Sequence, residues 1–170
     1  MRKFISITAI LLLVCLFFGG CVKNDKLFYS THLTISIKPP EDFQEVKIDG
    51  LAAAYESEYM AIRVLRERFE SYEGVDDRIN KDTSALEYAQ YLSEINEGSE
   101  GDAFVEGDLT LFYFTQSGSE KEFRGVAYVY KSVDSFWTVQ FITEKDQFDT
   151  YRDQIVRMAL SVGFRMVSNV

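Results

Sequence analysis

The chain has 170 residues, of which 46% are hydrophobic and 15% are aromatic, and its formal net charge is −9. So acidic a chain is repelled by nucleic acid and by anionic lipid surfaces, which argues against nucleic-acid binding. The length beyond an apolar N-terminal segment suits one domain with its own hydrophobic core.

Residues 1–20 have the layout of an export signal. Arg2 and Lys3 form a short positive region, residues 4–18 are apolar, and two glycines then precede Cys21. The apolar run is short for a membrane-spanning helix, which needs about 20 residues. We expect cleavage before Cys21 and attachment of a lipid to its thiol. An ordinary signal peptide with a chance cysteine, or an uncleaved membrane anchor, is the alternative.

This interpretation divides the chain into three parts. Residues 1–20 are the lipoprotein signal peptide, 21–31 are a lipid-anchored tether, and 32–170 are one domain held outside the cytoplasm as a membrane-anchored lipoprotein. Loss of residues 1–20 changes the net charge from −9 to −11 and removes Cys15. Cys21 is then the only cysteine, so an intrachain disulfide cannot form.

The first predicted elements are short strands. Apolar and polar residues alternate over 32–38, which predicts a half-buried strand that Pro39 and Pro40 end. A second strand is expected over 44–48, closed by the turn sequence Asp49-Gly50. Residues 59–69 fit a helix and a strand equally well, because their apolar residues match both periods.

The next element is a helix over about 84–97. Ser84 and Glu87 have the spacing of a capping box, in which each side chain binds a backbone amide at the helix start. An apolar stripe of one helix face follows, and Gly98 favours the end of the helix. The stripe consists of Ala85, Tyr88, Ala89, Leu92 and Ile95.

Three strands and a second helix complete the prediction. The strands cover about 109–115, 123–131 and 136–143, joined by turn-rich segments as an antiparallel meander, and the helix covers about 145–161. The strand at 109–115 is apolar on both faces and therefore needs cover on both sides. We expect an α/β (α+β) fold, an α-β-α sandwich with a mostly antiparallel sheet and helices on both faces.

The order of these elements resembles the PsbP-like superfamily. The similarity rests on a meander, a Ser-x-x-Glu-Tyr helix at Ser84–Tyr88, a second meander and the closing stretch FWTVQFITEKDQFDTYRDQIVRMALSVGF. That superfamily includes an extrinsic photosystem II subunit, a Ran-binding import factor and prokaryotic lipoproteins. The resemblance implies the same sandwich, favours a strand at 59–69, and implies protein binding without a shared catalytic site.

No group of residues predicts catalysis or a transition-metal site. His32 is the only histidine, so a Ser-His-Asp triad or a zinc site would depend on it alone, and we interpret it as a solvated residue at a strand end. The acidic stretch from Glu94 to Asp108 could supply calcium ligands but lacks EF-hand spacing, which favours a solvated, mobile loop. No cofactor is expected.

Two further features have a structural and a functional interpretation. Trp137 and its aromatic neighbours could line a ligand groove, although aromatic residues at alternating strand positions usually belong to a core. Arg63, Arg66 and Arg68 could receive an acidic partner, although a charged outer face paired with nearby acids is more common.

The sequence therefore favours a lipid-anchored, non-catalytic envelope protein. Its expected partners are the membrane, through the lipid at Cys21, and another envelope protein that it binds or helps to assemble. A small-molecule or metal-ion binding lipoprotein is the alternative, and an enzyme is a third possibility. A large apolar pocket would favour the ligand hypothesis, whereas a flat exposed apolar patch would favour protein binding.

Overall fold

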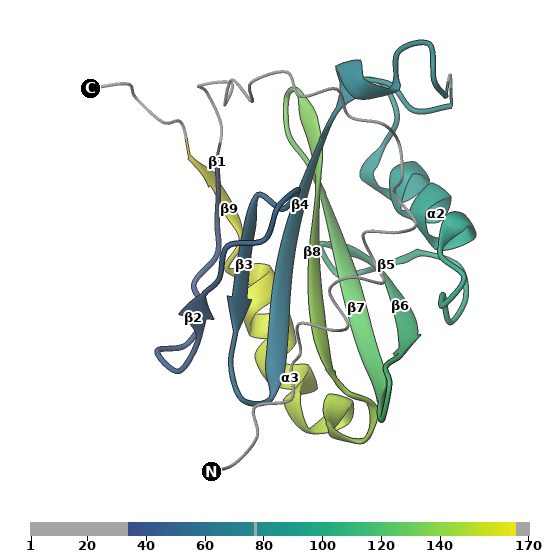
Figure 1. Ribbon diagram of the computed structural model, residues 1–170. Helices are drawn as coiled ribbons and strands as arrows, with labels where there is room; N and C mark the ends of the chain where they lie inside the picture. The colour runs from purple at the N-terminus through teal and green to yellow at the C-terminus, as the bar shows by residue number, and fades with distance from the viewer. Residues whose placement is uncertain (1–33, 77, 166–170) are drawn as a thin grey trace.

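The structure is a computed structural model that describes residues 34–76 and 78–165 (Figure 1). Its centre is a seven-stranded sheet in which every neighbouring pair is antiparallel. The strands follow one another across the sheet as β2 (Gln44–Glu45), β3 (Ala53–Glu56), β4 (Met60–Arg68), β8 (Ser135–Glu144), β7 (Glu122–Lys131), β6 (Leu109–Ser117) and β5 (Phe104–Glu106).

Two α-helices and a small second sheet lie on the two faces of this sheet, and a short 3-10 turn follows the end of β4 and of β8 (Figure 1). They are the α-helices α2 (Ala85–Ile95) and α3 (Phe148–Leu160), the 3-10 turns η1 (Phe69–Tyr72) and η2 (Lys145–Gln147), and a two-stranded antiparallel sheet of β1 (Thr34–Ser36) and β9 (Gly163–Arg165). Helix α2 contacts β6 and β7 on one face. Helix α3 packs on the opposite face, together with the small sheet.

The two layers follow from the side chains of the central strands. In β6, Leu109 and Leu111 belong to the core beneath α3, whereas Phe112 and Phe114 belong to the core beneath α2. Successive side chains of a strand point to opposite faces, so a strand apolar at every position must be covered twice. The α-β-α sandwich expected from the sequence is confirmed.

Helix α2 begins as its sequence predicts. The Ser84 hydroxyl accepts a hydrogen bond from the Glu87 amide at 3.1 Å, and the Glu87 carboxylate accepts one from the Ser84 amide at 2.7 Å. The buried face is rotated from the predicted stripe, because Ala89 and Ser93 lie near its middle. Ile95 therefore lies at the margin of this face and is about half exposed, contrary to the prediction.

Residues 60–68 form strand β4 rather than a helix. All nine residues pair with β8, and Ile62 and Val64 are fully buried beneath α3. The apolar pattern of these residues fits both the helical and the strand period, so pairing with the neighbouring strand decides the conformation.

Four predicted boundaries need correction. The strand expected at 44–48 is only two residues long, because it lies at the edge of the sheet and pairs with β3 alone. The strand expected at 32–38 is described from Thr34 onward and pairs with β9, an unpredicted strand, outside the large sheet. The helix expected at 145–161 begins with the 3-10 turn η2. The acidic stretch contains strand β5.

The two-layer arrangement predicts that the two helices contribute independently to the free energy of unfolding. Ile155→Ala in α3 should lower the free energy of unfolding by about 2–5 kcal/mol, because Ile155 is fully buried. Leu92→Ala in α2 should cost less, since Leu92 is only partly buried. The two residues belong to cores on opposite sides of the sheet, so the double variant should lose nearly the sum. Chemical denaturation of the three variants measures this, and a strong coupling between the losses would contradict the layering.

Candidate functional site

Two of the predicted site residues, Cys21 and His32, lie outside the described residues. Trp137 lies in the core, with 2% of its surface exposed. Its indole nitrogen donates to the Ser132 hydroxyl at 3.2 Å, and the Arg66 guanidinium lies 4.9 Å from its ring centre. The indole is therefore covered. Trp137 is a core residue, as the alternation of its strand indicated, and does not line a ligand groove.

The three arginines of β4 do not form one basic face. Arg66 pairs with Asp134 at 2.7 Å, and Arg68 pairs with Glu70 at 2.8 Å. Arg63 points to the opposite face of the sheet, where only 5% of its surface is exposed. Burial favours the neutral form of Asp134, but hydrogen bonds from Ser135 and the charge of Arg66 outweigh it and hold the pKa of Asp134 below its usual range.

The acidic stretch is held against the sheet, which corrects the expectation of a mobile loop. Arg124 donates to both carboxylate oxygens of Glu100, the shortest contact being 2.8 Å, and its guanidinium lies over the Phe148 ring. Backbone hydrogen bonds join Glu100 to Tyr113 and Gly98 to Thr115. Gly98 is needed here, because a Cβ atom would stand 2.0 Å from the Thr115 carbonyl oxygen.

Calcium ligation by this stretch gains no support. Across residues 34–76 and 78–165, no group of three or more His, Cys, Asp or Glu side chains is placed to hold a metal ion. No helix in those ranges is long and apolar enough to cross a membrane.

A partly buried polar cluster beneath α2 was not predicted from the sequence. The Glu67 carboxylate accepts hydrogen bonds from the hydroxyls of Tyr72, at 2.8 Å, and of Tyr88, and the two hydroxyls lie 3.1 Å apart. The Tyr88 ring also stacks on Phe136 at 4.0 Å between ring centres. Burial and, next, the nearby Glu67 charge raise the pKa values of both tyrosines above their usual range. The Ser-x-x-Glu-Tyr motif contained Tyr88, but nothing local pointed to Glu67.

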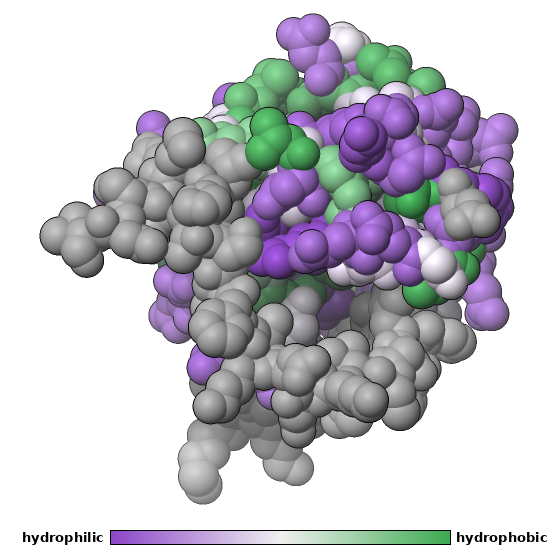
Figure 2. Space-filling view, turned by 90° about the horizontal axis from the view of Figure 1, so that it is seen from above, coloured by the Kyte–Doolittle hydropathy of each residue, from purple (hydrophilic) through white to green (hydrophobic). Residues whose placement is uncertain are grey.

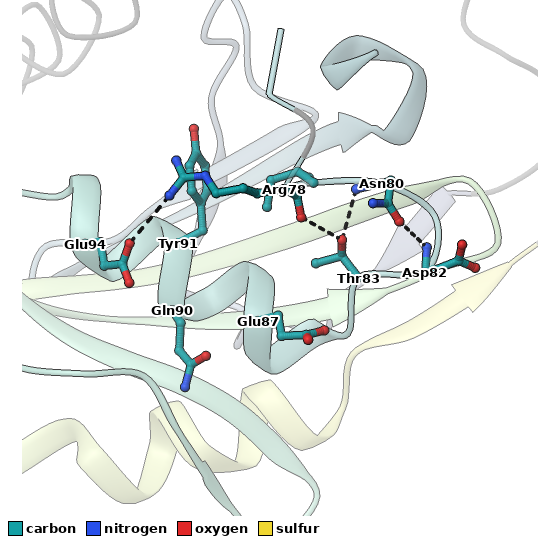
Figure 3. A pocket seen from close by; sticks show the side chains of 9 residues that line it. Arg78, Asn80, Asp82, Thr83, Glu87, Gln90, Tyr91 and Glu94 are labelled. Carbon is teal, nitrogen blue, oxygen red and sulfur yellow. Dashed lines mark hydrogen bonds and ion pairs between the residues drawn. The ribbon is translucent and has the colours of Figure 1, made fainter. Parts of the chain in front are cut away.

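This cluster lies beside a hollow of about 430 Å³ between α2 and the loop before it. Figure 3 shows Arg78 reaching over Tyr91 toward Glu94, with Thr83 bound to the Arg78 carbonyl. The hollow is open and its lining is largely polar. Figure 2 views the molecule from this end and shows hydrophobic patches among hydrophilic ones. The hollow is therefore not an enclosed apolar cavity of the kind that holds a small molecule.

The clearest exposed apolar feature is strand β5, at the end of the large sheet. Phe104 is 39% exposed and Val105 is 53% exposed, on opposite faces of a strand that pairs only with β6 among the described strands. The side chains of Asp102 and Asp108 flank β5 and are exposed. An edge strand presents unpaired backbone groups, which can pair with a strand of another chain. This edge could therefore bind an extended, basic peptide segment.

Comparisons with known proteins give neighbours in structure only, since no family model and no curated protein matches the chain. A protein of Bacteroides thetaiotaomicron has a TM-score of 0.51 at 10% identity, over 77% of this chain and 45% of that one. LpqN of Mycobacterium tuberculosis, which its description places in cell envelope biogenesis, has a TM-score of 0.48 at 13% identity, over 78% of this chain and 83% of LpqN.

Cyanobacterial PsbP of Synechocystis sp. PCC 6803 is also among the neighbours, with a TM-score of 0.48 at 11% identity. The match covers 86% of this chain and all of that one. At such identities the likeness concerns the fold alone, because one fold carries many functions.

The tyrosine–glutamate cluster predicts alkaline sensitivity. A tyrosine whose pKa is raised in the folded state keeps its proton after the unfolded chain has lost it, above pH about 10. The contribution of each such tyrosine to the unfolding free energy should therefore be constant below that pH and fall above it by about 1.4 kcal/mol per pH unit. Tyr88→Phe should make the fall of the unfolding free energy with pH less steep by the share of one tyrosine. It should also lower the unfolding free energy at neutral pH by about 1–3 kcal/mol, since Glu67 loses a hydrogen-bond donor.

Urea denaturation between pH 7 and 11 measures both effects. Tyr91→Phe is the matched control, because it removes a hydroxyl from the same helix that has no hydrogen-bond partner among the described residues. An unchanged slope in Tyr88→Phe would contradict the account of the cluster.

Proposed function

We propose that this chain is a lipid-anchored, non-catalytic protein of the cell envelope, which binds another protein through the outer edge of β5, where no described strand pairs. The export signal and Cys21 support the anchor and the location. The compact core, with Trp137 inside it, supports a binding module over a ligand carrier.

The exposed edge of β5 carries the proposal. Monomeric proteins usually protect edge strands with charges, bulges or covering loops, because an open edge pairs readily with other strands. Strand β5 is short and contains the exposed Glu106, but Phe104 and Val105 remain exposed on its two faces. Added strands gain affinity from backbone hydrogen bonds and specificity from side-chain contacts, and the flanking acids Asp102 and Asp108 favour a basic segment.

The anchor is tested by Cys21→Ser in the native host. The variant should lose fatty-acid labelling, because the thiol that accepts the lipid is gone, and the domain should be released or remain as an uncleaved precursor. Metabolic labelling and membrane fractionation measure this. A serine variant that is processed and membrane-bound like the parent would exclude the lipoprotein assignment.

The binding edge is tested by Val105→Lys. This substitution places a charge on the proposed contact and should reduce chemical crosslinking of the full-length protein to envelope proteins at least several-fold. Val133→Lys is the matched control, since Val133 is 84% exposed in the β7–β8 turn, away from β5. Quantitative mass spectrometry of crosslinked partners compares the variants. Equal losses in both variants, or no loss in either, would exclude the β5 edge as the binding surface.

A further inference from the structure

A second hollow lies on the α3 side of the molecule, and its charges differ from those of the rest of the surface. It has a volume of about 350 Å³ and is lined by residues of α3 and by the segment that follows β1. Its polar lining consists of Lys38, Gln154, Arg157 and Ser161. No carboxylate lines it, although the chain has 27 Asp and Glu residues against 18 Lys and Arg residues.

The two cations of this hollow have no acidic partner among the described residues, a property they share with Lys47, Lys81 and Lys131. Seven other described cations pair with carboxylates, namely Arg66, Arg68, Arg78, Lys121, Arg124, Lys145 and Arg152. Within the part of the chain that the structure describes, Lys38 and Arg157 make no ion pair. Asp153 lies four residues before Arg157 on α3, a spacing that permits a pair, yet the two stay more than 4.0 Å apart.

Regular structure holds the two cations beside one another. Strand β1 pairs with β9, with Ser36 opposite Gly163, so Lys38 follows directly next to the end of α3. Arg157 and Ser161 are one helical turn apart on α3. Pro39 and Pro40 fix the backbone after Lys38, because the proline ring locks φ. Gln154 is held by a hydrogen bond from its amide nitrogen to the Tyr59 hydroxyl, at 3.2 Å.

From this arrangement we infer that the hollow binds a phosphate group. The two cations match the negative charge of a phosphate group. The Arg157 guanidinium can donate two parallel hydrogen bonds to phosphate oxygens, and Lys38 adds a point charge. The Ser161 hydroxyl is exposed at the rim and already donates to the Met158 carbonyl, at 2.7 Å, so it supplies no further donor there. The site is open, so it takes a small or terminal phosphate: a free phosphate or the headgroup of a phospholipid.

The inference goes beyond the proposed function and does not depend on the anchor. Its test uses the full-length protein in dodecyl maltoside micelles, which contain no phosphorus. Inorganic phosphate is titrated, and broadening of its ³¹P resonance reports binding. The broadening should saturate, and Lys38→Gln and Arg157→Gln should each weaken binding by about threefold or more. Lys81→Gln, which removes the same charge from the loop before α2, should leave binding unchanged.

A second arm distinguishes the source of the phosphate. Phosphatidylglycerol and phosphatidylcholine are mixed into the same micelles, and phosphatidylcholine serves as the internal control for micelle size. Selective broadening of the phosphatidylglycerol resonance, lost in Lys38→Gln and Arg157→Gln, identifies a lipid headgroup. Saturable binding of inorganic phosphate alone identifies a free phosphate.

Two outcomes would overturn the inference: no saturable broadening with any probe, or an equal loss in Lys81→Gln, which would reflect net charge only. Failure here leaves the proposed function standing, because neither Cys21 nor the residues of β5 line this hollow. Conversely, Cys21→Ser should lose the anchor and still bind inorganic phosphate as the parent does.

Discussion

The central strands β6, β7 and β8 carry buried side chains on both faces, and the rest of the fold depends on covering them. A strand of this kind exposes apolar surface to water unless a layer lies on each side, and burial of that surface is the main favourable term in folding. Helix α2 covers one face, and α3 with the β1–β9 sheet covers the other. Between α2 and α3 the chain forms strands β5 to β8, so a different helix covers each face of the sheet.

Strand β4 shows how polar groups are accommodated beside this core. Ile62 and Val64 face α3 and are fully buried, whereas Arg63 and Glu67 point to the other face. A carboxylate that is partly withdrawn from water is costly without hydrogen bonds, and Tyr72 and Tyr88 provide them to the half-buried Glu67. This cluster joins η1 to α2, and residues 78–80, 82 and 83 between them line the hollow in Figure 3.

The two proposed binding features lie on different parts of this scaffold. The β5 edge lies at one end of the large sheet, and the Lys38–Arg157 hollow lies on the α3 side, close to β1. Strand β1 follows the segment that leads from Cys21, so the basic hollow is near the proposed membrane anchor in the chain. The acidic surroundings of β5 and the basic hollow select ligands of opposite charge. Residues of β5 carry the first feature, and residues of α3 and the segment after β1 carry the second.

The sequence by itself determined the elements that depend on local chemistry. The Ser84–Glu87 capping box set the start of α2, and the doubly apolar pattern of 109–115 required two covering layers. The alternation around Trp137 indicated a core position. Each of these features is encoded within a few residues, where periodicity or a single cap decides the outcome.

The tertiary structure alone decided which distant residues meet. Pairing with β8 made 60–68 a strand, and the backbone contacts of Gly98 and Glu100 with β6 held the acidic stretch in place. Glu67 reached Tyr88 across 21 positions, and Lys38 met Arg157 because β1 pairs with β9. Periodicity specifies the faces of an element but not its neighbours, since strand pairing is settled by contacts between segments far apart in the chain.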